Sequence, residues 1–99
     1  MNASNAVRIS DLLFSEAPEA ATHAGLLGWV RFTLSDLVVL DGIALRRTRD
    51  GDRFVLSFPA RRDGTGRQRF FSRPISDAVR REIERQVLEH LQIKQDLVP

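Results

Sequence analysis

Apolar and polar residues alternate along much of the first two thirds of the chain, and this two-residue period is typical of β-strands. The alternation is clearest at residues 26–34, where Val30, Phe32 and Leu34 share one face of the predicted strand. The opposite face of that strand holds Leu27, Trp29, Arg31 and Thr33. Further strands are expected at residues 7–14, 37–47, 53–58 and 67–73.

Turn-forming residues separate these strands. Ser35-Asp36 and Asp50-Gly51 are typical of tight turns between antiparallel strands. Gly42, inside the strand expected at residues 37–47, indicates a bulge. Residues 15–25 and 60–66 are expected to be loops, although Pro18 and the residues after it could nucleate a short helical turn.

Two aromatic segments follow the Asp-Gly turn. Phe54, Leu56 and Phe58 fall on one side of the fourth strand and are expected to point into the core, before Pro59 ends its ladder. In the last strand Phe70 is expected to face the core. Phe71 lies on the opposite side, together with Arg67, Arg69 and Arg73.

A helical period replaces the strand period after Pro74. Ser76 or Asp77 can cap a helix that is expected to run to about Ile93. Its apolar stripe consists of Val79, Ile83, Val87 and Leu91, widened by Leu88. The sequence therefore predicts an α+β fold, in which a small antiparallel sheet of four to five strands is followed by one C-terminal helix packed on the sheet.

The composition suits one small globular domain. The 99 residues are 42% hydrophobic and 28% charged, and we expect a single domain over 1–99 with its core at about 7–93 and frayed termini. The chain has no cysteine, and its two histidines, His23 and His90, are far apart. A disulfide scaffold and a thiolate zinc site are thereby excluded, and no metal, cofactor or small-molecule substrate is expected.

Catalytic and membrane signatures are also missing from the sequence. No nucleophile elbow is present, so no catalytic residue is assigned and an enzyme is not expected. The apolar runs are much shorter than the roughly 20 residues of a membrane span, and residues 1–7 do not resemble a signal peptide. We expect a cytoplasmic protein that makes no membrane contact.

Positive charge is concentrated in the middle of the chain. The net charge is only +2, but fourteen of the fifteen basic residues are arginines. Twelve of these arginines lie within residues 44–85, against six acidic residues. This distribution favours a phosphate-rich partner, and the alternative is a solvated surface of paired charges.

One stretch resembles a known family. The run GDRFVLSFPARR at residues 51–62, the loop DGTG at 63–66 and the segment SRPI at 72–75 resemble the signature of the stage V sporulation protein G family of bacterial septation regulators. The segments VRI at 7–9 and VVLD at 38–41 also fit that family. Leu40 and Arg73 stand where the family usually has histidine, so the chain resembles a divergent member.

The resemblance implies a small α+β fold and a homodimer that binds DNA or RNA and regulates septation and gene expression. Arg61 and Arg62 stand at the family's basic pair, and guanidinium groups bind phosphate oxygens as forks. A mobile, solvated hairpin tip is the alternative. The other candidate nucleic-acid contacts are Arg46, Arg47, Arg73 and Arg81.

These further candidates have structural alternatives. Arg46 and Arg47 could instead form a charged strand edge that prevents aggregation. On the helix, Arg81 stands three residues before Glu84 and Arg85 four before Glu89, which are spacings of stabilising ion pairs.

Apolar side chains are expected on both faces of the sheet, but one helix can cover only one face. The apolar residues that we expect to lie at a dimer interface are Trp29, Leu27, Val55 and Phe71. A loop covering Trp29 and base stacking on Phe71 are the alternatives. Two function classes stay open: a dimeric nucleic-acid-binding regulator, and a protein-interaction adaptor that uses a sheet edge or an apolar strand face.

Overall fold

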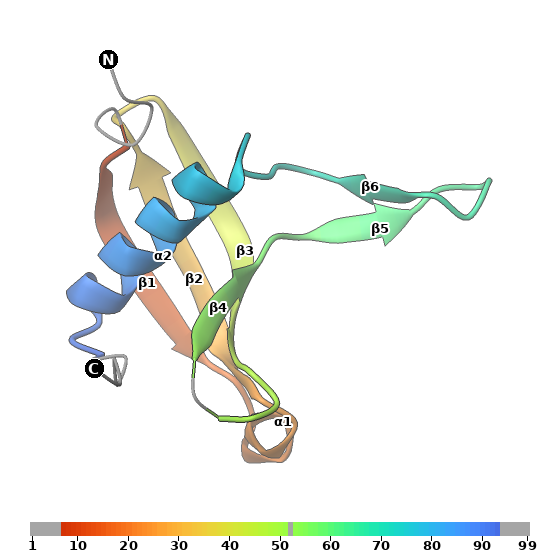
Figure 1. Cartoon of the computed structure of the whole chain (residues 1–99), viewed down its shortest axis with the longest axis horizontal. Coiled ribbons are helices and arrows are strands. Elements are labelled where there is room, and N and C mark those ends of the chain that lie inside the picture. Colours follow the sequence, from red (N-terminus) through yellow and green to blue (C-terminus); the bar gives the residue numbers. More distant parts are fainter. Residues whose placement is uncertain (1–6, 52, 94–99) are drawn as a thin grey trace.

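The computed structural model describes residues 7–51 and 53–93, which form the predicted α+β fold. Four strands make an antiparallel sheet in the order β1-β2-β3-β4, and a long helix packs on one face of it (Figure 1). The sheet strands are β1 (Ile9–Glu16), β2 (Leu26–Leu34), β3 (Val38–Arg47) and β4 (Phe54–Ser57). The remaining elements are α1 (Glu19–His23), the paired strands β5 (Ala60–Arg62) and β6 (Gln68–Phe70), and the long helix α2 (Asp77–His90).

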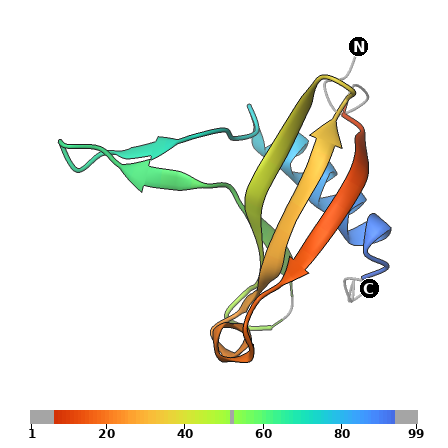
Figure 2. The same ribbon diagram turned by 180° about the vertical axis from the view of Figure 1, so that it is seen from behind.

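The core lies between the sheet and α2. Its most deeply buried side chains are Phe32, Ile43, Leu45, Ile83, Val30 and Val87. Leu56 and Phe58 are also buried, and Phe54 packs against the cluster, so the inward positions expected in the fourth strand are confirmed. Burial of each large apolar side chain contributes about 1.5–3 kcal/mol. Seen from behind, the opposite face of the sheet carries no helix (Figure 2).

Positive backbone angles shape the predicted turn between β2 and β3. Ser35 and Asp36 have φ values of 50° and 58°, and the amide of Leu37 donates to the carbonyl of Leu34 over 2.9 Å. Positive φ at both central residues matches the twist of the flanking strands. The predicted turn is therefore confirmed.

Two irregularities in the pairing of β2 with β3 affect which side chains face the core. Gly42 adopts a φ of 69°, where Asp41 and Gly42 interrupt the pairing of β3 with β2, and this is the predicted bulge. A second register shift lies between Leu26 and Gly28. Strict alternation places Leu27 beside Trp29, but this shift breaks the alternation. Leu27 packs against the core, so its expected place on the open face is wrong.

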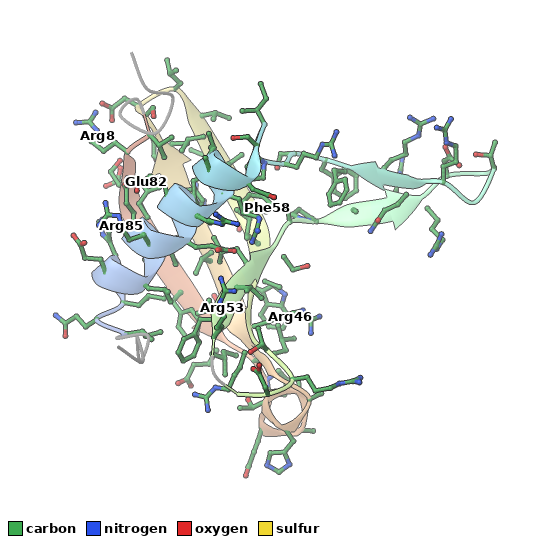
Figure 3. The ribbon with its side chains drawn as sticks, in the orientation of Figure 1. Arg8, Arg46, Arg53, Phe58, Glu82 and Arg85 are labelled. Carbon is green, nitrogen blue, oxygen red and sulfur yellow. The ribbon has the colours of Figure 1, made fainter. Side chains whose placement is uncertain are left out.

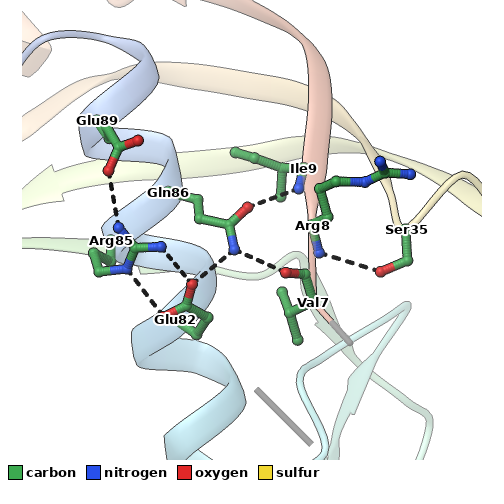
Figure 4. A network of polar contacts seen from close by, with 8 residues as sticks. All are labelled: Val7, Arg8, Ile9, Ser35, Glu82, Arg85, Gln86 and Glu89. Carbon is green, nitrogen blue, oxygen red and sulfur yellow. Dashed lines mark hydrogen bonds and ion pairs between the residues drawn. The ribbon is translucent and has the colours of Figure 1, made fainter. Parts of the chain in front are cut away.

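Helix α2 holds both edges of the sheet with side-chain hydrogen bonds. Gln86 accepts from the amide of Ile9 at 2.8 Å and donates to the carbonyl of Val7 at 2.9 Å, as a neighbouring strand would (Figure 4). At the other edge Glu84, whose side chain is 6% exposed, accepts from the amide of Leu56 at 3.0 Å. The amides of Ile9 and Leu56, which lie on the two edge strands, thus donate to side chains of α2. Backbone amides at the edges of a sheet need such partners when no further strand pairs with them.

A second polar cluster supports Gln86. Its amide nitrogen also donates to Glu82, and Arg85 pairs with Glu82 at 2.7 Å and with Glu89 at 2.8 Å. The hydrogen bond from Arg85, followed by that from Gln86, lowers the pKa of Glu82 to about 2. Glu82 is therefore ionised at neutral pH, and the expected pair of Arg85 with Glu89 is confirmed (Figure 4).

The helices differ from the prediction at their limits. Residues 15–25 are not all loop, because β1 extends to Glu16 and the carbonyl of Pro18 accepts the amides of the first turn of α1. The helical turn considered after Pro18 is therefore confirmed. Helix α2 begins at the Ser76 cap, and it ends at His90 rather than Ile93 because Gln92 adopts a φ of 60°.

Candidate nucleic-acid interface

Strands β5 and β6 form a separate two-stranded ribbon. They pair only with each other and project from the end of β4, away from the sheet and α2 (Figures 1 and 2). The loop expected at residues 60–66 is therefore partly strand. The strand expected at 67–73 is shortened to β6 and does not join the main sheet. We call residues 60–70 the arginine ribbon.

A well-defined turn closes the arginine ribbon. The amide of Gly66 donates to the carbonyl of Asp63 at 3.0 Å, and the amide of Asp63 donates to the carbonyl of Arg67 at 2.9 Å. Gly66 has a φ of 82°, a conformation that favours glycine. The Asp63 side chain accepts the amides of Thr65 and Arg67 at 2.8 and 3.1 Å. An aspartate followed three residues later by glycine is a signature of such a turn, so the sequence held a signal for this hairpin.

The strand register sorts the side chains of the ribbon onto two faces. Arg61 lies directly opposite Arg69, and alternation places Phe71 on the same side. Arg62 pairs with Gln68 on the other side, which also carries the pair Ala60 and Phe70. All residues of β6 are exposed. Arg61 and Arg69 thus form one accessible basic face.

The ribbon is strongly basic, together with the residues at its base. We call these residues, 59 and 71–75, the ribbon root. Residues 59–75 contain five arginines and one acidic residue, which gives a net charge of +4, whereas the rest of the chain sums to −2. The acidic residue is Asp63, and its pKa is lowered to about 2, first by the hydroxyl of Thr65 and then by Arg69. Asp63 is therefore an anion at neutral pH. Arg69 donates to it from Nε at 2.9 Å.

Two arginines, Arg61 of the ribbon and Arg73 just beyond it, lie over aromatic rings. The guanidinium carbon of Arg61 is 5.7 Å from the centre of Phe71, and that of Arg73 is 5.6 Å from the centre of Phe70. Such contacts orient a guanidinium without neutralising it. Phe70 is 42% exposed, so its expected place in the core is wrong: the strand that carries it leaves the sheet.

A groove of about 470 Å³ lies where the ribbon meets the body. Its lining includes Phe58, Phe70 and Arg73, as well as Ile75 and Arg80. Figure 3 places Phe58 beside α2, at the point where the chain leaves the sheet. Ile75 is 91% exposed, so the groove has an apolar rim beside two arginines.

Arg46 and Arg47 lie on the main sheet and not on the arginine ribbon. They end β3 at the end of the sheet that lies near α1 (Figure 1). Both are exposed, and Arg47 lies over the ring of Phe54 at 5.1 Å. Arg46 and Arg47 therefore belong to the main sheet, whereas Arg61 and Arg62 belong to the separate two-stranded ribbon.

The basic residues of α2 are mostly paired. Glu84 pairs with Arg80 at 3.0 Å and not with Arg81, so the expected pair of Arg81 with Glu84 is wrong. The four-residue spacing brings Arg80 onto the side of the helix that carries the buried Glu84. Arg81 is exposed and forms no ion pair within residues 7–51 and 53–93. Arg81 lies on α2, whereas the ribbon arginines lie on β5, on β6 and in the turn between them.

The four expected interface residues do not share one surface. Trp29 and Val55 lie on the open face of the sheet, where Trp29 is 37% exposed. One row of paired residues crosses the sheet from β1 to β4 and contains, in order, Ser15, Trp29, Ala44 and Ser57. Leu27 belongs to the core side, whereas Phe71 is 66% exposed beside the ribbon.

The candidate set drawn from the sequence misses part of the ribbon. Asp63, Arg67 and Arg69 were not assigned to the site, yet the turn and the pairing bring them together with Arg61 and Arg62. Within the described ranges no group of three or more His, Cys, Asp or Glu side chains is arranged to bind a metal. Neither helix in that part of the chain has the length and hydrophobicity to cross a bilayer.

Comparison with known proteins does not assign the chain to a family. No family model matches the sequence, and no curated protein shows a significant match to it.

Proposed function

We propose that this protein is a small nucleic-acid-binding regulator that contacts the phosphates of DNA or RNA through the arginine ribbon. The observation that carries the proposal is the net charge of +4 on an isolated two-stranded ribbon and its root. The resemblance at residues 51–75 supports the same function, as a divergent member of the stage V sporulation protein G family acting in the cytoplasm. The protein acts by binding and not as an enzyme.

Charge neutralisation elsewhere favours the ribbon over the helix. Arg80 and Arg85 each pair with two acidic side chains on α2, so they offer little net charge to a polyanion. Arg61 and Arg73 instead lie over aromatic rings, which leave the charge of the guanidinium intact. Arg46, Arg47 and Arg81 stay predicted contacts outside the ribbon.

A homodimer is the second part of the proposal. The open face of the sheet carries Trp29 and Val55, and the ribbon root exposes Phe71. One helix covers one face of a sheet, and apolar side chains left on the other face favour association. Two copies would also present two ribbons, so that phosphate contacts made by one molecule raise the effective concentration of the other.

Fluorescence anisotropy with labelled single- and double-stranded probes tests the binding proposal. The Arg61→Ala/Arg62→Ala variant should lose affinity, and its log–log salt slope on duplex DNA should flatten by up to about two, or about 0.9 for each lost phosphate contact. The Arg49→Ala/Arg53→Ala variant removes the same charge near the β3–β4 turn and should keep the slope of the wild type.

Protein interaction is the competing function. The groove at the ribbon root, with its exposed Ile75 and Phe70, favours an adaptor that binds an apolar segment of another protein. Absence of binding to every nucleic-acid probe at low salt would reject the regulator and favour the adaptor.

A further inference from the structure

Arg69 pairs with the acidic residue of the ribbon, Asp63. It lies in β6 opposite Arg61, and its side chain is 62% exposed. Its Nε donates to Oδ2 of Asp63 at 2.9 Å, while Oδ1 of the same carboxylate accepts the amides of Thr65 and Arg67. The turn thus fixes the carboxylate, and the carboxylate fixes the guanidinium. Within residues 7–51 and 53–93 the two terminal nitrogens of Arg69 form no hydrogen bond, so they are a pair of donors that a ligand can use.

The dimensions of the ribbon fit one kind of nucleic-acid groove. Paired strands lie about 4.8 Å apart, and the major groove of B-form DNA, about 12 Å wide, admits a two-stranded ribbon. The major groove of an RNA duplex is deep and narrow and excludes protein side chains. No other element of the described chain packs along β5 or β6, so the ribbon can enter a groove without being shielded by the body.

We propose that the arginine ribbon enters the major groove of duplex DNA and that Arg69, positioned by Asp63, donates both terminal nitrogens to O6 and N7 of guanine. This inference rests on the proposed function and names its substrate class. Arginine binds those two acceptors bidentately, because their separation matches the guanidinium fork. The ribbon therefore adds a preference for guanine to phosphate binding that is otherwise independent of sequence.

Two modified duplexes test the contact directly. Replacing guanine by 7-deazaguanine removes the N7 acceptor from the major groove, whereas replacing it by inosine removes only the amino group in the minor groove. The wild type should bind the 7-deazaguanine duplex about fivefold more weakly and the inosine duplex unchanged, since a base contact is worth at least about that factor. Arg69→Ala should bind the unmodified and the 7-deazaguanine duplexes equally.

Asp63→Asn separates positioning from electrostatics. Asparagine keeps an oxygen for the amides of the turn, but its NH₂ group cannot accept the Nε–H of Arg69. The variant also loses one negative charge, so a merely electrostatic role predicts tighter binding with unchanged discrimination. The positioning role predicts that the fivefold discrimination falls towards one. Arg49→Ala, a change of one charge away from the ribbon, should keep the discrimination.

The outcomes distinguish this inference from the function on which it rests. Equal binding of the wild type to the guanine and 7-deazaguanine duplexes would overturn the major-groove contact and leave the nucleic-acid-binding function standing. Tighter binding to single strands or to duplex RNA than to duplex DNA would overturn the assignment to duplex DNA. Failure to bind any probe at low salt would reject the proposed function itself.

Discussion

The hydrogen bonds of Glu84 make a strong prediction about stability. Glu84 is the buried charged residue of the described core, and it accepts from the Leu56 amide and from Arg80, each at 3.0 Å. Glu84→Ala leaves the edge amide of β4 buried without a partner, which costs about 1–3 kcal/mol. Loss of the pair with Arg80, whose side chain is 32% exposed, adds up to about 1 kcal/mol. We expect a total loss of about 2–3 kcal/mol.

Urea unfolding followed by circular dichroism measures this loss. A domain of this size unfolds with a slope of about 1–1.5 kcal/mol per molar urea, so the midpoint should fall by roughly 1.3–3 M. Glu89→Ala is the matched control, because it removes a carboxylate that is 70% exposed and pairs with Arg85. It should cost less than about 0.5 kcal/mol. Equal midpoints for the two variants would refute the role assigned to Glu84.

Three further predictions address the sheet edge, the ribbon turn and the oligomeric state. Gln86→Ala should speed hydrogen exchange of the Ile9 amide and destabilise the fold by about 1–2 kcal/mol, and unchanged exchange would contradict the edge contact. Because folding lowers the pKa of Asp63 from 3.8 to about 2, the turn contacts should persist above pH 4 and be lost as the pH falls through 2. The Thr65 amide shift should therefore titrate near pH 2 in the wild type and not in Asp63→Asn, and a midpoint near 4 would count against this account. Sedimentation equilibrium should give twice 11.2 kDa at micromolar concentration, and a single species of 11.2 kDa would reject the homodimer.

The sequence predicts the main sheet and the helix because their signals are local and repeated. The alternation in residues 26–34 reproduces β2 at both ends, and the four-residue period after Ser76 reproduces the stripe of α2. Gly42 also marks its bulge correctly. In these segments burial, period and turn chemistry all favour the same structure.

The errors arise where tertiary context decides. Leu27 turns towards the core through a register shift that alternation alone does not reveal. Phe70 has the pattern of a core residue, yet it lies on a ribbon that leaves the sheet, and its ring meets Arg73 instead. The alternation of Arg67, Arg69 and Arg73 around Phe70 and Phe71 is visible in the sequence, but the pairing of Arg69 with Arg61 and its hydrogen bond to Asp63 are not.

The most direct test of the central claim is amide and arginine-Nε NMR during titration of the labelled protein with a short DNA duplex. The account predicts that the largest shifts fall in residues 60–73, with the Nε signals of Arg61 and Arg69 among them, and that the signal of Arg85 on α2 changes little. Shifts confined to the open face around Trp29 or to α2, with the ribbon unchanged, would contradict it.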